Sequence, residues 1–294
     1  MNRRKRLRLK LNSRTLLLGE RTMVMGVLNV TPDSFSDGGR FLEPELAVEQ
    51  ALAMEKAGAD LLDIGGESTR PGSQETSPAE ELDRILPVLE ALRGGLKISI
   101  SVDTRRATVA DLALRAGAEI INDISGLNHD PKIAEVAARH GVPLILMHMR
   151  GEPRTMQAGP FARDVMQDVL QGLRRSVAAA RKAGVAKSQI ILDPGVGFGK
   201  NFAQNYELLQ KLQQLARLGY PLLVGTSRKG FLGATLARDG RPAPPEERIW
   251  GTAATVTASI LHGAHIVRVH DVAEMVRVAR VADCLLDPKQ SPRN

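Results

Sequence analysis

Polar side chains recur along this chain at the ends of short aliphatic runs, where a folded sheet could gather them into one site. If the runs are neighbouring parallel strands in a closed barrel, the carboxyl ends of the strands open on one face. Carboxylates and carboxamides on that face could bind N–H groups, whereas arginine and histidine suit a phosphate. The residues in these positions are Asn29, Asp63, Asp103, Asn122, His148, Asp193, Arg268 and His270.

Three of these residues, Asp103, Asn122 and Asp193, would present acidic or amide groups to one narrow, apolar mouth. A carboxylate accepts two parallel N–H bonds, and a heterocycle with an amino group beside a ring N–H donates such a pair. A guanidinium offers the same pair of donors. The pattern therefore predicts a ligand with paired N–H groups but does not distinguish these two chemistries.

Positive charge is predicted beside this group, from Arg268 and His270. Arg228, Lys229 and the start of the helix after them would add an anion site, because free N–H groups at a helix start favour negative charge. The run GVGFGK at 195–200 is similar to a phosphate-binding loop, but it lacks the GK[ST] ending and the full spacing, so alone it is weak. We expect the ligand to carry an anionic arm.

Structural roles compete with these assignments. Asp63 could cap a helix, since Asp after a parallel strand often does so, and that role is as well supported as a functional one. Asp103 is less needed as a cap because Thr104, which follows it, can serve. His148 could simply be hydrogen-bonded in the mouth of a barrel, and Asp193, in the sequence DPG, could only form a turn.

A repeated unit would position these residues, in which a helical stretch ends in glycine and a short aliphatic run follows. Glycine suits the residue after a helix, and a run that is apolar on both faces is typical of a strand covered on both sides. Strands are expected near 23–29, 60–64, 98–103, 119–123, 143–148, 189–193, 221–225 and 265–269. Helices are expected near 44–57, 78–92, 105–116, 131–140, 162–183, 203–218, 245–262 and 271–286.

Eight strands that alternate with helices over about 250 residues predict an α/β protein with a single (β/α)8 TIM barrel. An open doubly wound sheet is the alternative, but strict alternation without a dinucleotide fingerprint favours the barrel. No Gly/Ser linker divides the chain after residue 20. We therefore assign residues 20–288 to one barrel domain and residues 1–19 to a short basic N-terminal extension.

The positive charge of the chain is concentrated at its start. The formal net charge is +7, and the first ten residues hold six Lys or Arg and no acid. Such a run is usually a solvated tail; nucleic-acid binding is the alternative, without interleaved aromatics or a known module to support it. No stretch approaches the roughly 18 apolar residues of a membrane span. The single cysteine, Cys284, cannot form an internal disulfide, so a cytoplasmic location is expected.

Eight motifs, in order, resemble those of the dihydropteroate synthases, a family of pterin-binding enzymes. The resemblance covers residues 20 to 285, and its most specific motifs are GVLNVTPDSFSDGG at 26–39 and DIGGESTRPG at 63–72. The others are SVDT at 101–104, INDISG at 121–126, LMHM at 146–149, DPGVGFGK at 193–200, GTSRK at 225–229 and RVHD at 268–271.

This resemblance implies a transferase of folate biosynthesis, the family that sulfonamides target. Such an enzyme condenses 6-hydroxymethyl-7,8-dihydropterin pyrophosphate with 4-aminobenzoate and yields 7,8-dihydropteroate and pyrophosphate. The resemblance also implies Mg²⁺ as cofactor and a homodimer as assembly. Neither a nucleic acid nor a membrane is expected as a partner.

The resemblance assigns roles residue by residue. Asn29 is implied as the magnesium ligand. Pterin binding is implied for Asp103, Asn122, Asp193 and Lys229, with Met147 on the pocket wall. A catalytic role is implied for Asp103, Asp193, Lys229 and Arg268. Arg268 would pack on the pterin and reach the phosphates together with His270. Two loops, at 31–39 and 65–73, would close over the substrates through Phe35, Thr69, Arg70 and Pro71. Of these residues, Phe35 and Pro71 would border the aminobenzoate together with Lys229.

One position departs from the family pattern. The residue after the lysine is often Ser, whose hydroxyl meets the aminobenzoate carboxylate, whereas this chain has Gly230. That contact must then come from a backbone N–H or from water.

Two other functions fit part of the pattern. A methyltetrahydrofolate:corrinoid methyltransferase shares Asp and Asn at strand ends, but it has no use for a pyrophosphate site. A catalytically silent pterin-binding protein is disfavoured because Asn29, Arg70, Lys229, Arg268 and His270 are all present.

Overall fold

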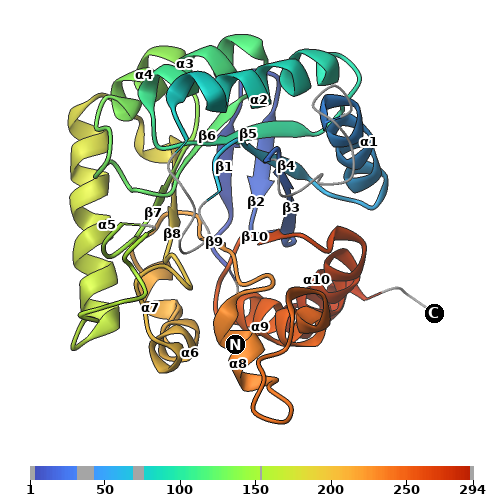
Figure 1. Cartoon of the computed structure of the whole chain (residues 1–294), viewed down its shortest axis with the longest axis vertical. Coiled ribbons are helices and arrows are strands. Elements are labelled where there is room, and N and C mark those ends of the chain that lie inside the picture. Colours follow the sequence, from blue (N-terminus) through green and yellow to red (C-terminus); the bar gives the residue numbers. More distant parts are fainter. Residues whose placement is uncertain (1–3, 32–42, 69–75, 153, 292–294) are drawn as a thin grey trace.

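Parallel strands at the centre and helices around them make up the structure, a computed structural model that describes residues 4–31, 43–68, 76–152 and 154–291. Eight strands form a barrel, and the helices lie around it as a ring (Figure 1). Successive parallel strands need a long crossover connection, and here each crossover contains at least one helix. The predicted (β/α)8 fold is confirmed.

The barrel strands lie where the aliphatic runs predicted them, within two residues at each end. They are β3 (Met23–Asn29), β4 (Leu61–Gly65), β5 (Ser99–Asp103), β6 (Ile120–Asp123), β7 (Leu144–Met147), β8 (Ile190–Asp193), β9 (Leu223–Val224) and β10 (Ile266–Val269).

The helices also follow the predicted order, with differences in the last third of the chain. They are α1 (Glu43–Lys56), α2 (Pro78–Leu92), α3 (Ala107–Ala116), α4 (Ile133–His140), α5 (Val165–Lys182), α6 (Phe202–Gln210), α7 (Gln213–Ala216), α8 (Gly230–Thr235), α9 (Ile249–Leu261) and α10 (Val272–Leu286). The helix predicted at 203–218 is two helices, and α8, the helix expected to begin after Lys229, had been given no range. In the described ranges, no helix has the length and apolar character needed to cross a membrane.

The sheet closes on itself between β8 and β9. The strand order is β8-β7-β6-β5-β4-β3-β10-β9, which leaves β8 and β9 at its two ends. Leu192 of β8 bridges to Leu222, and its N–H donates to the carbonyl of Pro221 at 2.9 Å. The alternative of an open doubly wound sheet is therefore wrong.

A polar layer lies directly above an apolar one inside the barrel. The apolar layer includes Leu61, Ile120, Ile145, Ile191 and Ile266. Side chains of a strand alternate between its two faces, so the residue two positions later faces the interior again. On these five strands those residues are Asp63, Asn122, Met147, Asp193 and Arg268. Strand alternation therefore directs the polar groups toward the carboxyl end of the barrel.

A hairpin of β1 (Leu7–Lys10) and β2 (Thr15–Leu18) packs against the amino end of the barrel. Leu9 and Leu18 are buried in the same cluster as the apolar layer, whereas Arg8 and Lys10 are exposed. The interpretation of the basic run as a solvated tail is thus wrong for these residues. Alternating Leu and basic residues make the hairpin amphipathic, and its apolar face covers the barrel.

Arg4 fixes the start of this hairpin to the body of the protein. Its guanidinium pairs with Asp283 of α10 and donates to Thr22 Oγ1 at 2.6 Å and to Ala264 O at 2.9 Å. Both charged side chains are buried, with 3% and 6% exposed. The pair is therefore largely protected from solvent screening.

We expect Arg4→Ala to lower the free energy of unfolding by about 3–5 kcal/mol, because Asp283 would keep a buried charge without its partner. Arg6→Ala is the matched control: Arg6 is 75% exposed and 3.5 Å from Glu20, so a change of about 0.5 kcal/mol or less is expected. Urea unfolding of both variants measures this difference. Equal losses would contradict it.

Candidate active site

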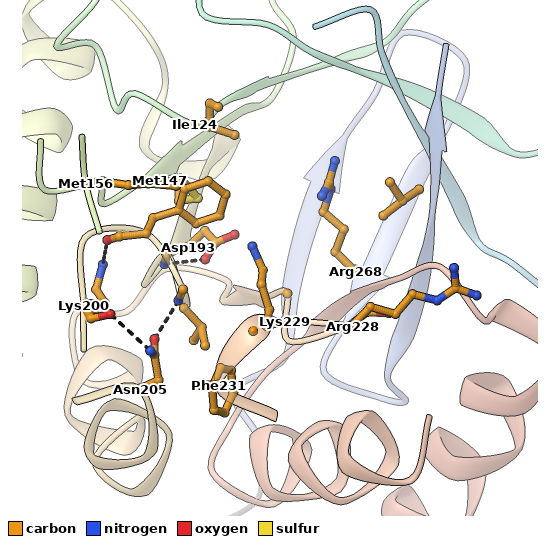
Figure 2. Close-up of a pocket in the computed structure, with 18 of the residues that line it drawn as sticks. Ile124, Met147, Met156, Asp193, Lys200, Asn205, Arg228, Lys229, Phe231 and Arg268 are labelled. Atoms are coloured by element: carbon orange, nitrogen blue, oxygen red, sulfur yellow. Dashed lines mark hydrogen bonds between the residues drawn. The ribbon is translucent and has the colours of Figure 1, made fainter. Parts of the chain in front are cut away.

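A cavity of about 830 Å³ opens at the carboxyl end of the barrel (Figure 2). Its lining brings together eight of the residues predicted from the sequence, from six strands and the turns that follow β9 and β10. These are Asn29, Asp103, Asn122, Met147, Asp193, Lys229, Arg268 and His270. The other four predicted residues, Phe35, Thr69, Arg70 and Pro71, lie outside the described residues.

Asp193 presents one carboxylate oxygen to the cavity. Its Oδ1 accepts the N–H of Gly195 at 2.7 Å, a bond that fixes the side chain. Burial raises the pKa of Asp193 to about 6, against the opposing effects of the Gly195 hydrogen bond and the charge of Lys229. The free oxygen can therefore accept ligand N–H groups once the acid is ionised.

Lys229 points into the same space as Asp193 (Figure 2). Its Nζ lies 3.9 Å from the centre of the Phe198 ring, close enough for a cation–π contact. No ion pair within 4.0 Å joins Lys229 to Asp193 in the described part of the chain, which leaves room for a ligand between them. Burial, and then the charge of Arg268, lowers the pKa of Lys229 to about 8.

Arg268 is held by two carboxylates. Its Nε donates to Asp63 Oδ2 at 2.6 Å, and its Nη2 donates to Asp103 Oδ2 at 2.7 Å. Burial raises the pKa of Asp103 to about 7, although Arg268 opposes this shift. The three groups form a buried cluster at the edge of the cavity.

Asp63 has a different position from the one that helix capping would require. It lies inside β4, two residues before the strand ends at Gly65, and it is fully buried. Besides Arg268, it accepts the Nδ2 group of Asn122 at 2.9 Å. The cap interpretation is wrong, because the strand continues past Asp63 and the side chain faces the barrel interior.

His270 does not have the charge, and Arg228 does not have the direction, that was expected for the predicted anion site. His270 is bonded through its Nδ1 to Ser227 Oγ at 3.0 Å, and burial lowers its pKa to about 3. In the free protein it is a neutral imidazole rather than the expected cation. Arg228 points away from Lys229 (Figure 2) and donates to Asp271 at 2.6 and 3.2 Å. The cations nearest the centre are therefore Lys229 and Arg268.

Comparison with known proteins agrees with this geometry. The model of the pterin binding enzyme family matches residues 25–270. The chain is 52% identical over 267 residues to the dihydropteroate synthase of Synechocystis sp., with 91% of each chain covered. It is 49% identical to that of Bacillus subtilis, with 91% of this chain and 90% of the relative covered. The chain belongs to the dihydropteroate synthase family.

Solved structures of the family share the whole fold. The Xanthomonas albilineans synthase with 4-aminobenzoic acid has a TM-score of 0.88 and 41% identity, over 96% of this chain and 99% of that one. The Yersinia pestis synthase with a sulfonamide drug has a TM-score of 0.87 and 45% identity, over 98% and 100%. The fold of nearly all of this chain is thus that of the family.

Lys200 is a buried residue of the site that the sequence did not single out as a binding group. Its Nζ donates to the carbonyls of Phe198 and His148 at 2.9 and 3.2 Å and contacts His148 Nδ1 at 3.1 Å. Its three hydrogens are therefore used within the protein, and the loop 195–200 is not a phosphate loop. The hydrogen-bonded role expected for His148 is confirmed.

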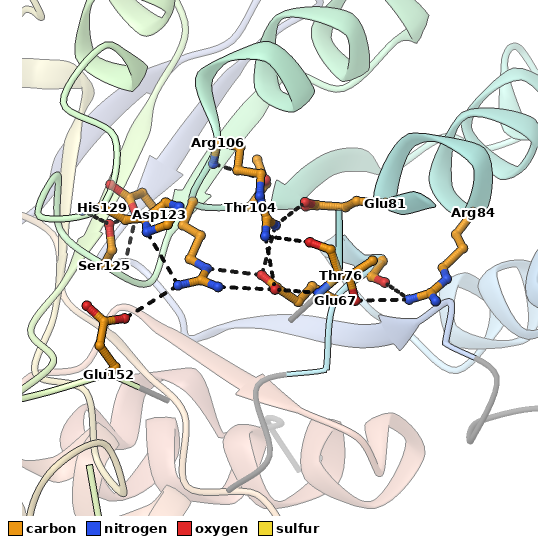
Figure 3. A network of polar contacts seen from close by, with 12 residues as sticks. Glu67, Thr76, Glu81, Arg84, Thr104, Arg106, Asp123, Ser125, His129 and Glu152 are labelled. Atoms are coloured by element: carbon orange, nitrogen blue, oxygen red, sulfur yellow. Dashed lines mark hydrogen bonds and ion pairs between the residues drawn. The ribbon is translucent and has the colours of Figure 1, made fainter. Parts of the chain in front are cut away.

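A second group missed in the sequence fixes the described ends of the loop between β4 and α2 (Figure 3). Glu67, on the cavity wall, accepts bonds of 3.0–3.2 Å from Arg105 and Arg106. Arg106 also donates to the carbonyl of Thr76 at 2.6 Å, and Arg84 donates to Thr76 Oγ1 at 3.3 Å. The sequence signal for this group was the pair of adjacent arginines after β5, but the direction of their side chains could not be predicted from the sequence.

Proposed function

We propose that this chain is a dihydropteroate synthase, which joins 6-hydroxymethyl-7,8-dihydropterin pyrophosphate to 4-aminobenzoate with release of pyrophosphate. One observation carries the proposal: Asp103, Asn122, Asp193 and Lys229 line a single cavity beside Arg268. This is the set that the family motifs imply, and the relatives described above bear the same name.

The cavity suits a pterin ring between Asp193 and Lys229. The free oxygen of Asp193 would accept N–H groups from the 2-amino group and the ring, while Lys229 would donate to acceptors on the opposite edge. Met147, which is buried beside Ile124, would cover a ring face. Asp193 must be ionised for this contact, so we expect binding to need a pH above about 6.

The diphosphate arm would lie near Arg268, His270 and Asn29. The described residues hold no cluster of three or more His, Cys, Asp or Glu side chains that could bind a metal alone. Mg²⁺ commonly keeps waters and shares substrate phosphates with one or two protein oxygens, and the carboxamide of Asn29 on the cavity wall fits that role. When bound, the ion would supply positive charge to the leaving diphosphate.

The chemistry is formation of a carbon–nitrogen bond as the carbon–oxygen bond to pyrophosphate breaks. The pterin can delocalise positive charge from its exocyclic methylene, and Asp103 and Asp193 would stabilise that charge electrostatically. Arg268 would donate to the departing phosphate oxygens. The aromatic amine is already neutral at pH 7, so its attack needs no strong base, and its proton leaves after the bond has formed.

Gly230 leaves space beside the proposed aminobenzoate position. A Cβ added to it would meet no other heavy atom within 4 Å, and Gly230 lines the cavity. We expect Gly230→Ser to lower the KM for 4-aminobenzoate by about fivefold, because one hydrogen bond contributes about 1 kcal/mol. The KM for the pterin substrate is the internal control and should not change. An unchanged or higher KM for 4-aminobenzoate would contradict the placement.

A coupled assay for pyrophosphate release tests the function. Release that requires both 4-aminobenzoate and Mg²⁺ is expected. Release that does not depend on an amine would overturn the proposal. No release although the pterin diphosphate binds would also overturn it and would favour a silent pterin-binding protein. Transfer of a methyl group from methyltetrahydrofolate would favour the methyltransferase alternative.

We also propose a cytoplasmic homodimer, with α9 and α10 as the shared face. Large apolar side chains on these adjacent helices are exposed: Trp250 by 79%, Val281 by 64% and Leu285 by 59%. Such side chains on neighbouring elements are typical of an association surface. Sedimentation of Val281→Glu against Leu112→Glu on α3, where Leu112 is 42% exposed, tests this. Val281→Glu should dissociate the dimer, and Leu112→Glu should not.

A further inference from the structure

Asp63 lies beneath the cavity and contacts two residues that line it. It is fully buried in β4, and it is not itself part of the cavity wall. Its Oδ2 accepts two bonds, from Arg268 Nε at 2.6 Å and from Asn122 Nδ2 at 2.9 Å. One carboxylate therefore fixes two groups that belong to different strands, β10 and β6.

The bond to Asn122 determines which end of its carboxamide faces away from Asp63. An ionised carboxylate only accepts hydrogen bonds, so Asn122 must present its NH₂ group to Asp63. Asn122 is 2% exposed and lines the cavity, and its Oδ1 is buried with no partner in the described ranges. A buried acceptor without a partner favours a ligand that brings an N–H group to it.

The bond to Arg268 determines the direction of its guanidinium. Asp63 binds the Nε atom, the part of the group nearest the backbone, and Asp103 binds Nη2. Because the guanidinium is planar, a bond at Nε fixes the plane in which the terminal nitrogens lie. The outer nitrogens can then exchange Asp103 for an anionic oxygen while the inner bond persists.

We propose that Asp63 is a positioning residue of the pterin subsite, which holds the carboxamide of Asn122 as a hydrogen-bond acceptor and the guanidinium of Arg268 as a donor. This rests on the proposed function, because the ligand that brings the N–H group and the diphosphate is the pterin substrate. Asp63 acts through its two neighbours and does not touch the reacting atoms.

Asp63→Leu tests the role by removing the oxygen that both partners share. Without Oδ2, neither Asn122 Nδ2 nor Arg268 Nε has its acceptor on β4, so both side chains would lose their orientation. We expect the affinity for 6-hydroxymethylpterin, followed by its fluorescence, and the affinity for the pterin diphosphate to fall at least about tenfold. The KM for 4-aminobenzoate at saturating pterin should stay within about twofold.

Asp123→Leu and Asp123→Asn are the matched controls for burial. Asp123 is fully buried at the end of β6, but its carboxylate binds the backbone N–H groups of Ser125 and Leu127. Both controls should lose stability and keep their pterin affinity. If Asp63→Leu and Asp123→Leu both lose affinity in proportion to a fall in Tm, Asp63 is merely structural and the proposal is wrong.

Asp63→Asn is the conservative variant and tests orientation directly. Its amide oxygen can take the position of Oδ2 and accept from both Asn122 and Arg268, while its NH₂ group takes the position of Oδ1, which has no partner in the described ranges. We expect pterin affinity to recover at least about fivefold over Asp63→Leu.

Failure of Asp63→Asn to recover affinity in a folded protein would overturn the proposal, as would pterin affinity in Asp63→Leu within twofold of the parent chain. If the parent chain itself does not bind 6-hydroxymethylpterin, the proposed function fails instead. The two failures are therefore distinguishable.

Discussion

Replacing Asp193 with Asn is expected to lower the affinity for the pterin diphosphate by about 100-fold while the barrel stays folded. The new amide oxygen can still accept the Gly195 N–H, which Asp193 accepts at 2.7 Å. Its NH₂ group must then face the N–H donors of the pterin, so donors oppose donors. Loss of two bonds to a charged acceptor is worth about 3 kcal/mol, which corresponds to about 100-fold in affinity.

Titration of the folded variant with 6-hydroxymethylpterin, together with the KM of the pterin diphosphate, measures this loss. Asp123→Asn is again the matched control, because Asp123 is also a buried strand-end carboxylate that accepts the N–H two residues ahead, from Ser125 at 2.8 Å. The control should bind the pterin normally. Unchanged affinity in Asp193→Asn would remove the central contact of the proposed pterin site.

The barrel strands could be predicted because their signals are local. Each strand is a short run, buried on both faces, that follows a glycine or a polar turn, and a polar residue or glycine ends or follows it. The hairpin at 7–18 was missed because its six-residue alternation, RLRLKL, was interpreted by its charge rather than by its period. The extent of the helix at 230–235 could not be predicted because six residues carry little periodicity.

Site residues at strand ends could be predicted for the same reason, since the fold brings strand ends together. Asp63 required a further step, because it lies two residues before the end of β4 and only the alternation within that strand shows that it faces the interior. The protonation of His270 depends on burial by distant segments. The direction of the Lys200 side chain depends on the conformation of the loop at 195–200, where the carbonyl of Phe198 accepts one of its hydrogen bonds. Neither follows from local sequence.

Arg268→Met is expected to be the most damaging single change in the chain. It removes the donor that faces the departing diphosphate, and loss of one such group commonly costs about 10²–10³ in kcat. It also leaves Asp63 and Asp103 without the cation that lies 2.6 and 2.7 Å from them. A buried charge left unpaired in this way costs about 3–5 kcal/mol of stability.

The stability lost in this variant should depend on pH, and the sign can be derived. Burial already raises the pKa of Asp103 to about 7, and Arg268 opposes that shift, so its removal raises the pKa further. Between the unfolded pKa of about 3.9 and the native value, the folded state then binds more protons than the unfolded state. Stability must therefore fall as the pH rises through this window.

Urea unfolding of Arg268→Met at pH 5.5 and pH 8 measures this dependence directly. The deficit relative to the parent chain should be larger at pH 8, where Asp103 must ionise or remain protonated at a cost in free energy. Arg21→Met is the matched control: Arg21 is 55% exposed and binds Asp60 at the surface, so about 1 kcal/mol or less is expected. A deficit that shrinks at pH 8 would mean that Asp103 does not depend on Arg268 for its charge, and the cluster at the edge of the cavity would need another explanation.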